Sequence, residues 1–401
     1  MTKKPSSEQI RNSNKKMVLR CIRTHQPISR AEIAERIHIS KPTVSSLVDE
    51  LVRENWVHEK GIGESSSQGG RRPIHLYFNE RAGYVIGVDI GGTKVITIIS
   101  DLNGNIICSS SFKSKKYLED SLLKQIHRDI FELIEKNGID ANLIMGMGVG
   151  VPGITETKTG VVMEAPSLNW VRYPFLMEAE RYFSIPIFVD NDVNVAVLGE
   201  QWLGNAKNKK NVLFIAVGTG IGSGIIIHNQ LYRGSSNAAG ELGYVVTDKN
   251  DMKNKFKPIF HRYGYLESVA GGKAIGVKVT KLILEDRNHP LYKEALNSEL
   301  TGEQAFLLAR AGDKVGLNVV EDAIEHLAYG IINAASLLNP EVIILDGGVM
   351  KSADFILPRL KKTVHQYLPS SVEITVSQLG EHTGALGAVS LFLREYDSIL
   401  K

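Results

Sequence analysis

A glycine turn between two apolar runs is the first segment of this sequence whose residue types suggest chemistry. Residues 85–100 read VIGVDIGGTKVITIIS, and a Gly-Gly turn between such runs predicts a β-hairpin. Because glycine has no side chain, we expect the backbone N–H groups of Gly91 and Gly92 to be open to a phosphate. Asp89 would lie at the mouth of the hairpin, where a carboxylate can hold a metal ion or order water. Alone, this pattern is more often structural.

The same plan occurs a second time, far along the chain. Residues 212–232 read VLFIAVGTGIGSGIIIHNQLY, in which a turn of Gly218, Thr219 and Gly220 joins two apolar runs. Two copies of a strand, a glycine turn and a strand predict two similar lobes that face a cleft. Each lobe would present a phosphate-binding turn to that cleft.

The first part of the chain is basic, although the whole chain is nearly neutral. Residues 1–81 contain fifteen Lys and Arg against nine Asp and Glu, an excess of six positive charges. Because the whole chain has a formal net charge of +3, the remaining residues carry a net charge of −3. A basic front on a mildly acidic body suggests contact with nucleic acid, and a solvated basic face is the alternative.

Two helix starts separated by a short turn predict a helix-turn-helix in this basic front, after a first helix over residues 7–24. Ser29 and Glu32 form a capping box, and Ser40 caps the next helix, which carries Pro42 in its first turn. In such a motif the N-terminal end of the second helix meets base edges and phosphates. The residues expected there are Lys41, Thr43, Ser45 and Ser46.

Two short strands after these helices would complete a winged helix. Residues 56–60 and 73–78 are expected as strands, and GIGESSSQGGRR lies between them as a wing. Arg71 and Arg72 suit a narrow, A·T-rich minor groove because its negative potential attracts arginine. An ordinary surface loop is the alternative. We therefore expect a DNA-binding domain over residues 1–80.

Composition places the chain among ordinary soluble proteins. Its 401 residues suggest two or three domains, and a hydrophobic content of 43% with 23% charged residues supports a sizeable core. Cys21 and Cys108, the two cysteines, give neither a disulfide framework nor a Cys-rich metal site. We expect no signal peptide and no membrane span, and therefore a cytoplasmic protein without a membrane partner.

The two glycine turns together resemble one protein family. DIGGTK at residues 89–94, paired with AVGTGIGSG at residues 216–224, resembles the ROK family of sugar kinases and sugar-responsive repressors, a branch of the actin-like sugar kinases. GGRRP at residues 69–73 resembles the wing of ROK repressors.

This resemblance implies an α/β fold with an N-terminal winged helix-turn-helix and a two-lobed, actin-like ATPase (ribonuclease H-like) body. The first lobe would cover residues 84–195 and would be closed by a helix over residues 384–396. The second lobe would cover residues 196–383.

The resemblance also implies roles for individual residues. Residues 191–194 match the family's N-D-x-N motif, which would make Asp192 the general base of a kinase. From the residues alone, Asp192 suits a helix N-cap equally well. The expected sugar-binding residues are Asn169, Asn191, Asp192, Glu241, Tyr244 and Glu267. The expected nucleotide- or phosphate-binding residues are Asp89, Gly91, Gly92, Thr93, Lys94, Gly218, Thr219, Gly220, Gly347 and Gly348.

The chain departs from the family pattern where ROK proteins carry a zinc site. Family members carry the motif G-E-x-G-H, and Tyr244 replaces its His in this chain. Family members then carry C-x-C-G-x-x-G-C-x-E. The corresponding segment here is IFHRYGYLES, in which Tyr265 stands at the position of the last Cys. Because tetrahedral zinc needs four ligands and the thiolates are absent, we expect no structural zinc. His261 is expected at the surface. Packing of Tyr244, Tyr263 and Tyr265 would replace the metal.

Functions from different classes fit these features. The leading expectation is a repressor of carbohydrate utilisation genes, in which a sugar or sugar phosphate changes the affinity for operator DNA. The alternative is an ATP-dependent, glucokinase-like sugar kinase with a DNA-binding appendage, which would need ATP and magnesium. A third hypothesis is a sugar-binding scaffold that has neither activity. The repressor requires no cofactor, and its expected partners are double-stranded operator DNA, the effector and further copies of the chain, as a homodimer or a dimer of dimers.

Overall fold

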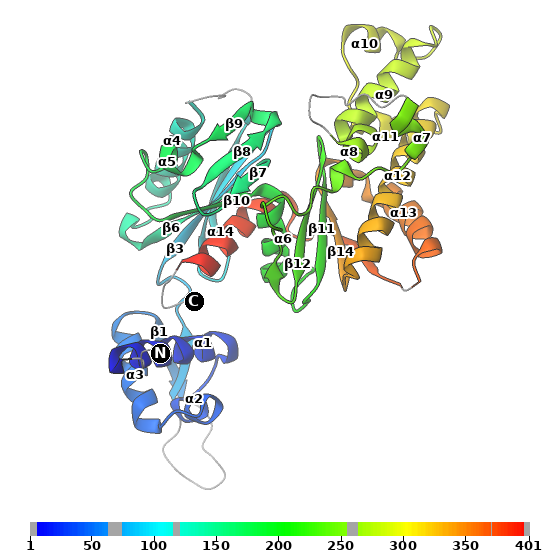
Figure 1. The fold of residues 1–401 in the computed structure, drawn as a ribbon. Coiled ribbons are helices and arrows are strands. Elements are labelled where there is room, and N and C mark those ends of the chain that lie inside the picture. The colour runs from blue at the N-terminus through cyan, green and yellow to red at the C-terminus, as the bar shows by residue number, and fades with distance from the viewer. Residues whose placement is uncertain (1–5, 63–73, 115–120, 255–263, 370, 397–401) are drawn as a thin grey trace.

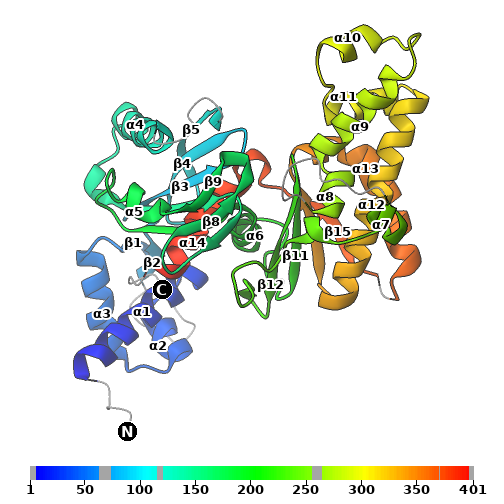
Figure 2. The same cartoon turned by 45° about the horizontal axis from the view of Figure 1, so that its top comes forward.

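The chain forms three parts in sequence order: a winged helix, a first lobe and a second lobe (Figure 1). The structure, a computed structural model, describes all residues except 1–5, 63–73, 115–120, 255–263, 370 and 397–401. Figure 2 shows the same parts from a second direction, with the second lobe carrying its helices on the side remote from the first lobe.

The winged helix forms where the capping residues predict it. It contains α1 (Ser7–His25), α2 (Arg30–Ile37), α3 (Lys41–Arg53) and the antiparallel strands β1 (Val57–Ile62) and β2 (Ile74–Phe78). Ser29 and Glu32 cap α2 reciprocally, and Ser40 Oγ accepts from the backbone N–H of Thr43 at 3.3 Å. These contacts confirm the predicted helix starts. One apolar face of α3 is buried, and it consists of Val44, Leu47, Val48 and Leu51.

The first lobe is built on a five-stranded sheet in the order β10-β6-β3-β4-β5. Its strands are β3 (Tyr84–Ile90), β4 (Val95–Asp101), β5 (Ile106–Phe112), β6 (Ile144–Val151) and β10 (Ile187–Asn191). The predicted hairpin is present, because β3, β4 and β5 are antiparallel neighbours, whereas β6 and β10 run parallel to β3. The lobe also contains α4 (Ser121–Lys136), α5 (Phe175–Ala179) and a small sheet of β7 (Ile154–Glu156), β8 (Val161–Ala165) and β9 (Trp170–Tyr173).

The second lobe repeats this strand arrangement, as the two sequence copies predict. Its sheet has the order β13-β12-β11-β14-β15, again with three antiparallel strands followed by two that run parallel to the first. The strands are β11 (Val212–Val217), β12 (Ile221–Ile227), β13 (Gln230–Leu231), β14 (Val342–Asp346) and β15 (Glu373–Val376). The helices are α7 (Lys249–Asn254), α8 (Tyr265–Ala270), α9 (Gly272–Leu284), α10 (Tyr292–Asn297), α11 (Gly302–Arg310), α12 (Lys314–Leu338) and α13 (Ala353–Tyr367).

Two helices connect the lobes. α6 (Asp192–Leu203) packs on β11 and β12 of the second sheet and on α14 (Thr383–Glu395), which returns to cover β3 and β6 of the first sheet. The predicted closing helix therefore packs where the resemblance places it. α6 also crosses the predicted lobe boundary between residues 195 and 196, because a single helix serves both lobes.

Candidate functional site

The carboxyl ends of three parallel strands bring the predicted residues of the first lobe together. Asp89 at the end of β3 pairs in register with Gly150 of β6, and Gly150 pairs with Asp190 of β10. Asn191, the last residue of β10, and Asp192, the first residue of α6, therefore lie near Asp89. This placement follows from sheet topology, because parallel strands present the same end at one edge.

Five carboxylates from both lobes form what we call the acidic row: Asp89, Asp192, Glu241, Glu267 and Asp346. Burial, followed by the charges of Asp89 and Glu241, raises the pKa of Asp192 to about 8. Burial, followed by the charge of Asp346, raises the pKa of Asp89 to about 7. Like charges have such effects only at short range, so acids of the first lobe face acids of the second. The acidic row can bind hydroxyl groups or a cation-bearing ligand.

Glu267 fixes the local backbone of the second lobe, while the side chain of Glu241 reaches solvent although many protein atoms surround it. Glu267 accepts from the backbone N–H of Gly264 at 2.7 Å and of Ile221 at 3.3 Å. Burial raises its pKa, and burial together with the charge of Glu267 raises the pKa of Glu241. Tyr244, three residues after Glu241, is 53% exposed. Glu241 is thus the acid of this pair that is placed to meet a ligand.

Asn191, and not Asp192, is the cap of α6. The side-chain oxygen of Asn191 accepts from the backbone N–H groups of Val193 and Asn194, each at 3.0 Å. Its Nδ2 donates to Gly153 O at 3.0 Å and to Oδ1 of Asp192 at 2.9 Å. This resolves the local ambiguity: Asn191 takes the capping role and orients the Asp192 carboxylate. Direct sugar binding by either residue, and by the exposed Asn169 at the end of a 3-10 turn, stays a prediction.

The first glycine turn corrects one expectation. The N–H of Gly91 is not open, because it donates to Lys94 O at 2.9 Å and closes the hairpin. Lys94 Nζ is ion-paired with Glu381 at 2.6 Å, just before α14. Gly92 lies against Ser167, where a Cβ would meet the serine side chain at 2.7 Å, and Thr93 is exposed.

The second glycine turn is backed by a helix N-terminus. Gly218 N–H also closes its own turn, by donating to Gly220 O at 3.0 Å. The carbonyl groups of Gly218 and Thr219 accept from the first residues of α9, so the turn is tied to that helix. Since β11 and β14 are adjacent, the turns at Gly218 and Gly347 are neighbours. Gly347 adopts a φ of 97°, whereas a side chain at Gly218 or Gly348 would enter open space.

The described residues at the family's zinc position make other contacts, and the absence of structural zinc stays a prediction. Tyr265 stands where the last Cys would be, and its ring is 1% exposed and packs edge-on to His326. Nδ1 of His326 in turn lies 2.6 Å from the hydroxyl of Thr247. Of the tyrosines expected to replace the metal, Tyr265 is buried, Tyr244 is exposed, and Tyr263 lies outside the described residues, as does His261. Across the described part of the chain, no three His, Cys, Asp or Glu side chains gather as metal ligands.

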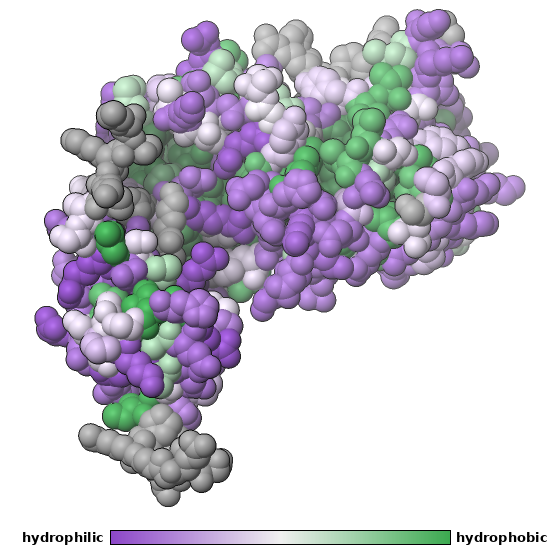
Figure 3. Space-filling view, turned by 60° about the horizontal axis from the view of Figure 1, so that its bottom comes forward, coloured by the Kyte–Doolittle hydropathy of each residue, from purple (hydrophilic) through white to green (hydrophobic). Residues whose placement is uncertain are grey.

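The residues expected to meet DNA lie at the start of α3, where Lys41, Thr43 and Ser46 are exposed and Ser45 is half-buried. The acids of α3 point elsewhere: Glu50 pairs with Arg11 at 3.0 Å, and Asp49 pairs with Arg30 at 2.7 Å. Hydrophilic residues cover much of the winged helix on the face shown in Figure 3. Arg71 and Arg72 lie outside the described residues, so their minor-groove role stays a prediction.

Two residues that sequence reasoning missed lie next to the acidic row. Asp190 is 1% exposed and pairs with Arg233 of the second lobe at 2.7 Å. A carboxylate that closes the apolar strand IFVD was the available signal for Asp190. Nothing in the sequence near Arg233 indicates its partner.

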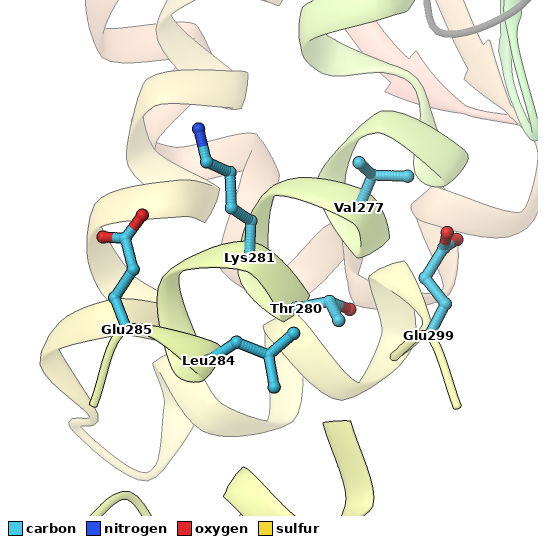
Figure 4. Close-up of a pocket in the computed structure, with 6 residues that line it drawn as sticks. All are labelled: Val277, Thr280, Lys281, Leu284, Glu285 and Glu299. Carbon is cyan, nitrogen blue, oxygen red and sulfur yellow. The ribbon is translucent and has the colours of Figure 1, made fainter. Parts of the chain in front are cut away.

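One cavity of about 470 Å³ lies away from the acidic row (Figure 4). It is an open hollow beside α9, and its lining residues are Val277, Thr280, Lys281, Leu284, Glu285 and Glu299. None of these was expected in the site, and no convergent polar group of the acidic row reaches it. We therefore place the candidate site at the acidic row, where the strand ends converge, and not in this hollow.

A winged helix in front of two sheets of identical strand order, with acids converging between the lobes, defines a DNA-binding regulator built on an actin-like sugar kinase body. The chain belongs to the ROK family, whose model matches residues 85–395. A MarR family model matches residues 12–60, within the winged helix.

Two known repressors or regulators match nearly the whole chain, and a glucokinase matches about three quarters of it. The xylose repressor of Caldicellulosiruptor bescii is 31% identical over 394 residues, which are 96% of each chain. The crystal structure of a ROK family transcriptional regulator, a homologue of the Escherichia coli Mlc protein, has the same fold, with a TM-score of 0.78 and 24% identity over 98% of each chain. A ROK family glucokinase from Streptomyces griseus, in complex with glucose and AMPPNP, matches 77% of this chain and 99% of its own, with a TM-score of 0.66 and 27% identity.

None of the helices in the described residues is both long and apolar enough to cross a bilayer.

Replacing Asp192 by Asn should change how stability depends on pH. The native Asp192 keeps its proton up to about pH 8, whereas the unfolded carboxyl loses it near 3.8. Between these values the native state binds more protons, so the wild type loses stability as pH rises. Asp192→Asn cannot ionise, so its gain in Tm over the wild type should grow from pH 5 to pH 8.5. For a chain of 401 residues that unfolds as one unit, a difference of 1 kcal/mol corresponds to roughly 1 °C, because the entropy of unfolding is about 2.1 cal/mol/K per residue. Thermal melts, with the exposed Glu285→Gln as control, measure this; parallel curves for Asp192→Asn and wild type would contradict it.

Metal analysis should find well under one zinc per chain in tag-free protein. Thiolates are the ligands that this segment lacks, since Cys21 and Cys108 are in α1 and β5. A chelator should leave the melting curve unchanged. Stoichiometric zinc that survives dialysis would show that the prediction is wrong.

Proposed function

We propose that this protein is a sugar-responsive transcriptional repressor of carbohydrate utilisation genes. The winged helix binds operator DNA, and a sugar or sugar phosphate at the acidic row changes the affinity for that DNA. The observation that supports this proposal most is that one chain combines two features. The start of α3 is exposed, as DNA binding requires, and the acidic row is shared by two lobes, as a ligand-responsive site requires. An effector acts only through unequal affinity for two states, and closure of the lobes offers such states.

The names of the relatives suggest which sugar should be tested first as the effector. A relative that aligns with 96% of this chain is named a xylose repressor, which supports D-xylose as the first effector to test. One winged helix makes few base contacts, so we propose a homodimer, or a dimer of dimers, on an inverted repeat.

A sugar kinase is the second candidate. It is supported by the two glycine turns, by the Asp192 carboxylate that Asn191 holds within the acidic row, and by the glucokinase structure that holds glucose and AMPPNP. In that case Asp192 would accept the proton of a sugar hydroxyl, while ATP with magnesium would supply the phosphoryl group. Against it stand the winged helix and Lys94, whose ammonium is paired with Glu381.

Glu241→Ala should weaken the response to sugar. Losing one charged hydrogen-bond partner costs about 1.5–3 kcal/mol, so the sugar concentration for half response should rise at least about tenfold. Thermal shift and operator gel shift with D-xylose, D-glucose and N-acetyl-D-glucosamine measure this, each with and without MgATP.

The matched control is Glu285→Ala, an exposed acid beside α9, which should respond as the wild type does. A normal sugar response in Glu241→Ala would refute the placement of the sugar. Turnover of ATP that Asp192→Asn abolishes would favour the kinase.

The wing arginines should contribute to binding on A·T-rich sites. Arg71→Ala with Arg72→Ala should lower affinity most on operators with A·T-rich flanks, and should reduce the log–log salt slope by about 1 for each lost phosphate contact. Gel-shift titrations at several salt concentrations test this. Lys361→Ala with Lys362→Ala removes equal charge from α13 of the second lobe and serves as control. Equal affinities of the wing variant and wild type on both kinds of flank would make the wing a simple loop.

A further inference from the structure

Arg233 connects the second lobe to the end of β10 in the first lobe. Its Nε and Nη2 both donate to Oδ2 of Asp190 at 2.7 Å. Asp190 is 1% exposed, so its charge depends on protein partners and not on water. Arg233 also approaches Glu395, at the end of α14, at 3.9 Å.

The partners of this ion pair lead directly to the two acids of the proposed sugar site. The second oxygen of Asp190 accepts from the backbone N–H of Asn191 at 2.7 Å and from Nδ2 of Asn194 at 3.1 Å, so it fixes the turn that carries Asp192. On the other side, Arg233 O accepts from the N–H of Ala239 at 3.1 Å.

That contact closes the loop that ends at Glu241. Gly240 O accepts from both the backbone N–H and the hydroxyl of Ser223 at 2.8 Å, which anchors the residue just before Glu241 on β12. One arginine therefore touches both the turn that carries Asp192 and the loop that carries Glu241.

We propose that Arg233 is a positioning residue that holds the carboxylates of Asp192 and Glu241 in the relative positions that a sugar requires. This inference rests on the proposed function. Arginine suits the task because its two N–H groups reach one carboxylate in a fixed geometry, whereas lysine offers a single point charge. The ion pair pre-organises the site before the sugar arrives.

Four variants of the full chain test this proposal. Arg233→Gln removes the charge, Arg233→Lys keeps it, and Asp190→Asn with Arg233→Gln removes the whole pair. Arg310→Gln, from the exposed pair with Asp354 in the same lobe, is the matched control. Hydrogen exchange of the sugar-free protein should speed up at residues 190–194 and 239–241 in Arg233→Gln, less in Arg233→Lys, and not in Arg310→Gln.

Calorimetry with D-xylose gives the second readout. We expect Arg233→Gln to lose at least tenfold in affinity, Arg233→Lys to lose less, and the double variant to recover part of the loss because no buried charge is left unpaired. Unchanged exchange at both segments would overturn the proposal. A wild type that ignores all tested sugars would refute the proposed function, while the exchange result still decides whether Arg233 positions these segments.

Arg23 forms a separate connection, between the winged helix and the body. Its Nη2 donates to Leu102 O at 2.6 Å, and its guanidinium lies 5.3 Å from the centre of the Phe78 ring. The N–H of Leu102 donates to Glu80 O at 3.0 Å, in the segment that joins the winged helix to β3. Leu102 is fully buried, and this turn between β4 and β5 is one of the places where the winged helix and the body meet.

The same turn packs against the last residues of α6. Gly104 has a φ of +85°, and a Cβ there would meet Leu203 at 2.6 Å and Trp202 at 2.9 Å. α6 begins with Asp192 and is 12 residues long, about 18 Å at 1.5 Å per residue. One helix thus has the acidic row at its start and the Arg23-bound turn at its end.

We infer that Arg23 positions the winged helix on this turn, so that a shift of α6 upon sugar binding changes the orientation of α3; this also rests on the proposed function. The contacts form a continuous packed path between two sites, and energetic coupling can travel along such a path. These contacts of Arg23 involve neither the DNA-reading end of α3 nor the acidic row.

The test compares Arg23→Gln with Arg20→Gln, an exposed residue of the same helix. Operator affinity without sugar should stay within threefold of the wild type in both. The ratio of operator affinities without and with D-xylose should fall at least fivefold in Arg23→Gln only, and by linkage the effect of operator on D-xylose affinity should fall by the same factor. An unchanged ratio in Arg23→Gln would overturn the inference.

A sugar-independent readout separates this inference from the proposed function. In a chain with Trp56→Phe and Trp170→Phe, Trp202 is the remaining tryptophan. Operator DNA alone should shift its fluorescence, and Arg23→Gln should abolish the shift. An identical shift with and without Arg23 would refute the path, whatever the sugar response.

Discussion

The packing of α14 on the first sheet at backbone distance is the constraint on which the rest of the structure depends. A Cβ at Gly87 or Gly148 would collide with a carbonyl oxygen of α14, so only glycine lets the helix lie directly on β3 and β6. On its other side, Gly387 lies against the backbone of α6 at Val195. Because α6 also packs on the second sheet, this glycine-lined contact sets where the second lobe begins.

The acidic row is a consequence of this arrangement. Gly384, in the first turn of α14, lies against the carboxylate of Asp89, so the helix brings protein around that acid and removes water. Burial and neighbouring charges then raise the pKa values of the acids, which is unfavourable for folding and typical of sites that bind ligands. Asp190, paired with Arg233, bonds the turn beside Asp192 and so holds it in place despite this repulsion.

The winged helix shares its core with the body. Buried side chains run without interruption from Val18 and Phe78 in the winged helix, through Leu102, to Leu386 and Phe392 of α14. A reorientation of the winged helix must therefore repack part of this cluster, and such packing favours discrete arrangements over gradual drift. This is the physical basis on which a small change at the acidic row could reach DNA.

The sequence by itself determined what depends on neighbours in the chain: the capped starts of α2 and α3, the two hairpins with glycine turns, and the repeated strand order. These features follow from capping, periodicity and turn chemistry, which act over a few residues. Only the tertiary structure decided which acids face one another, that Gly91 N–H closes its own turn, and that Tyr265 packs on His326. Asp190 meets Arg233 across 43 residues, and Lys94 meets Glu381 across 287. Pairings of this kind are set by how the sheets and helices pack, which no local pattern records.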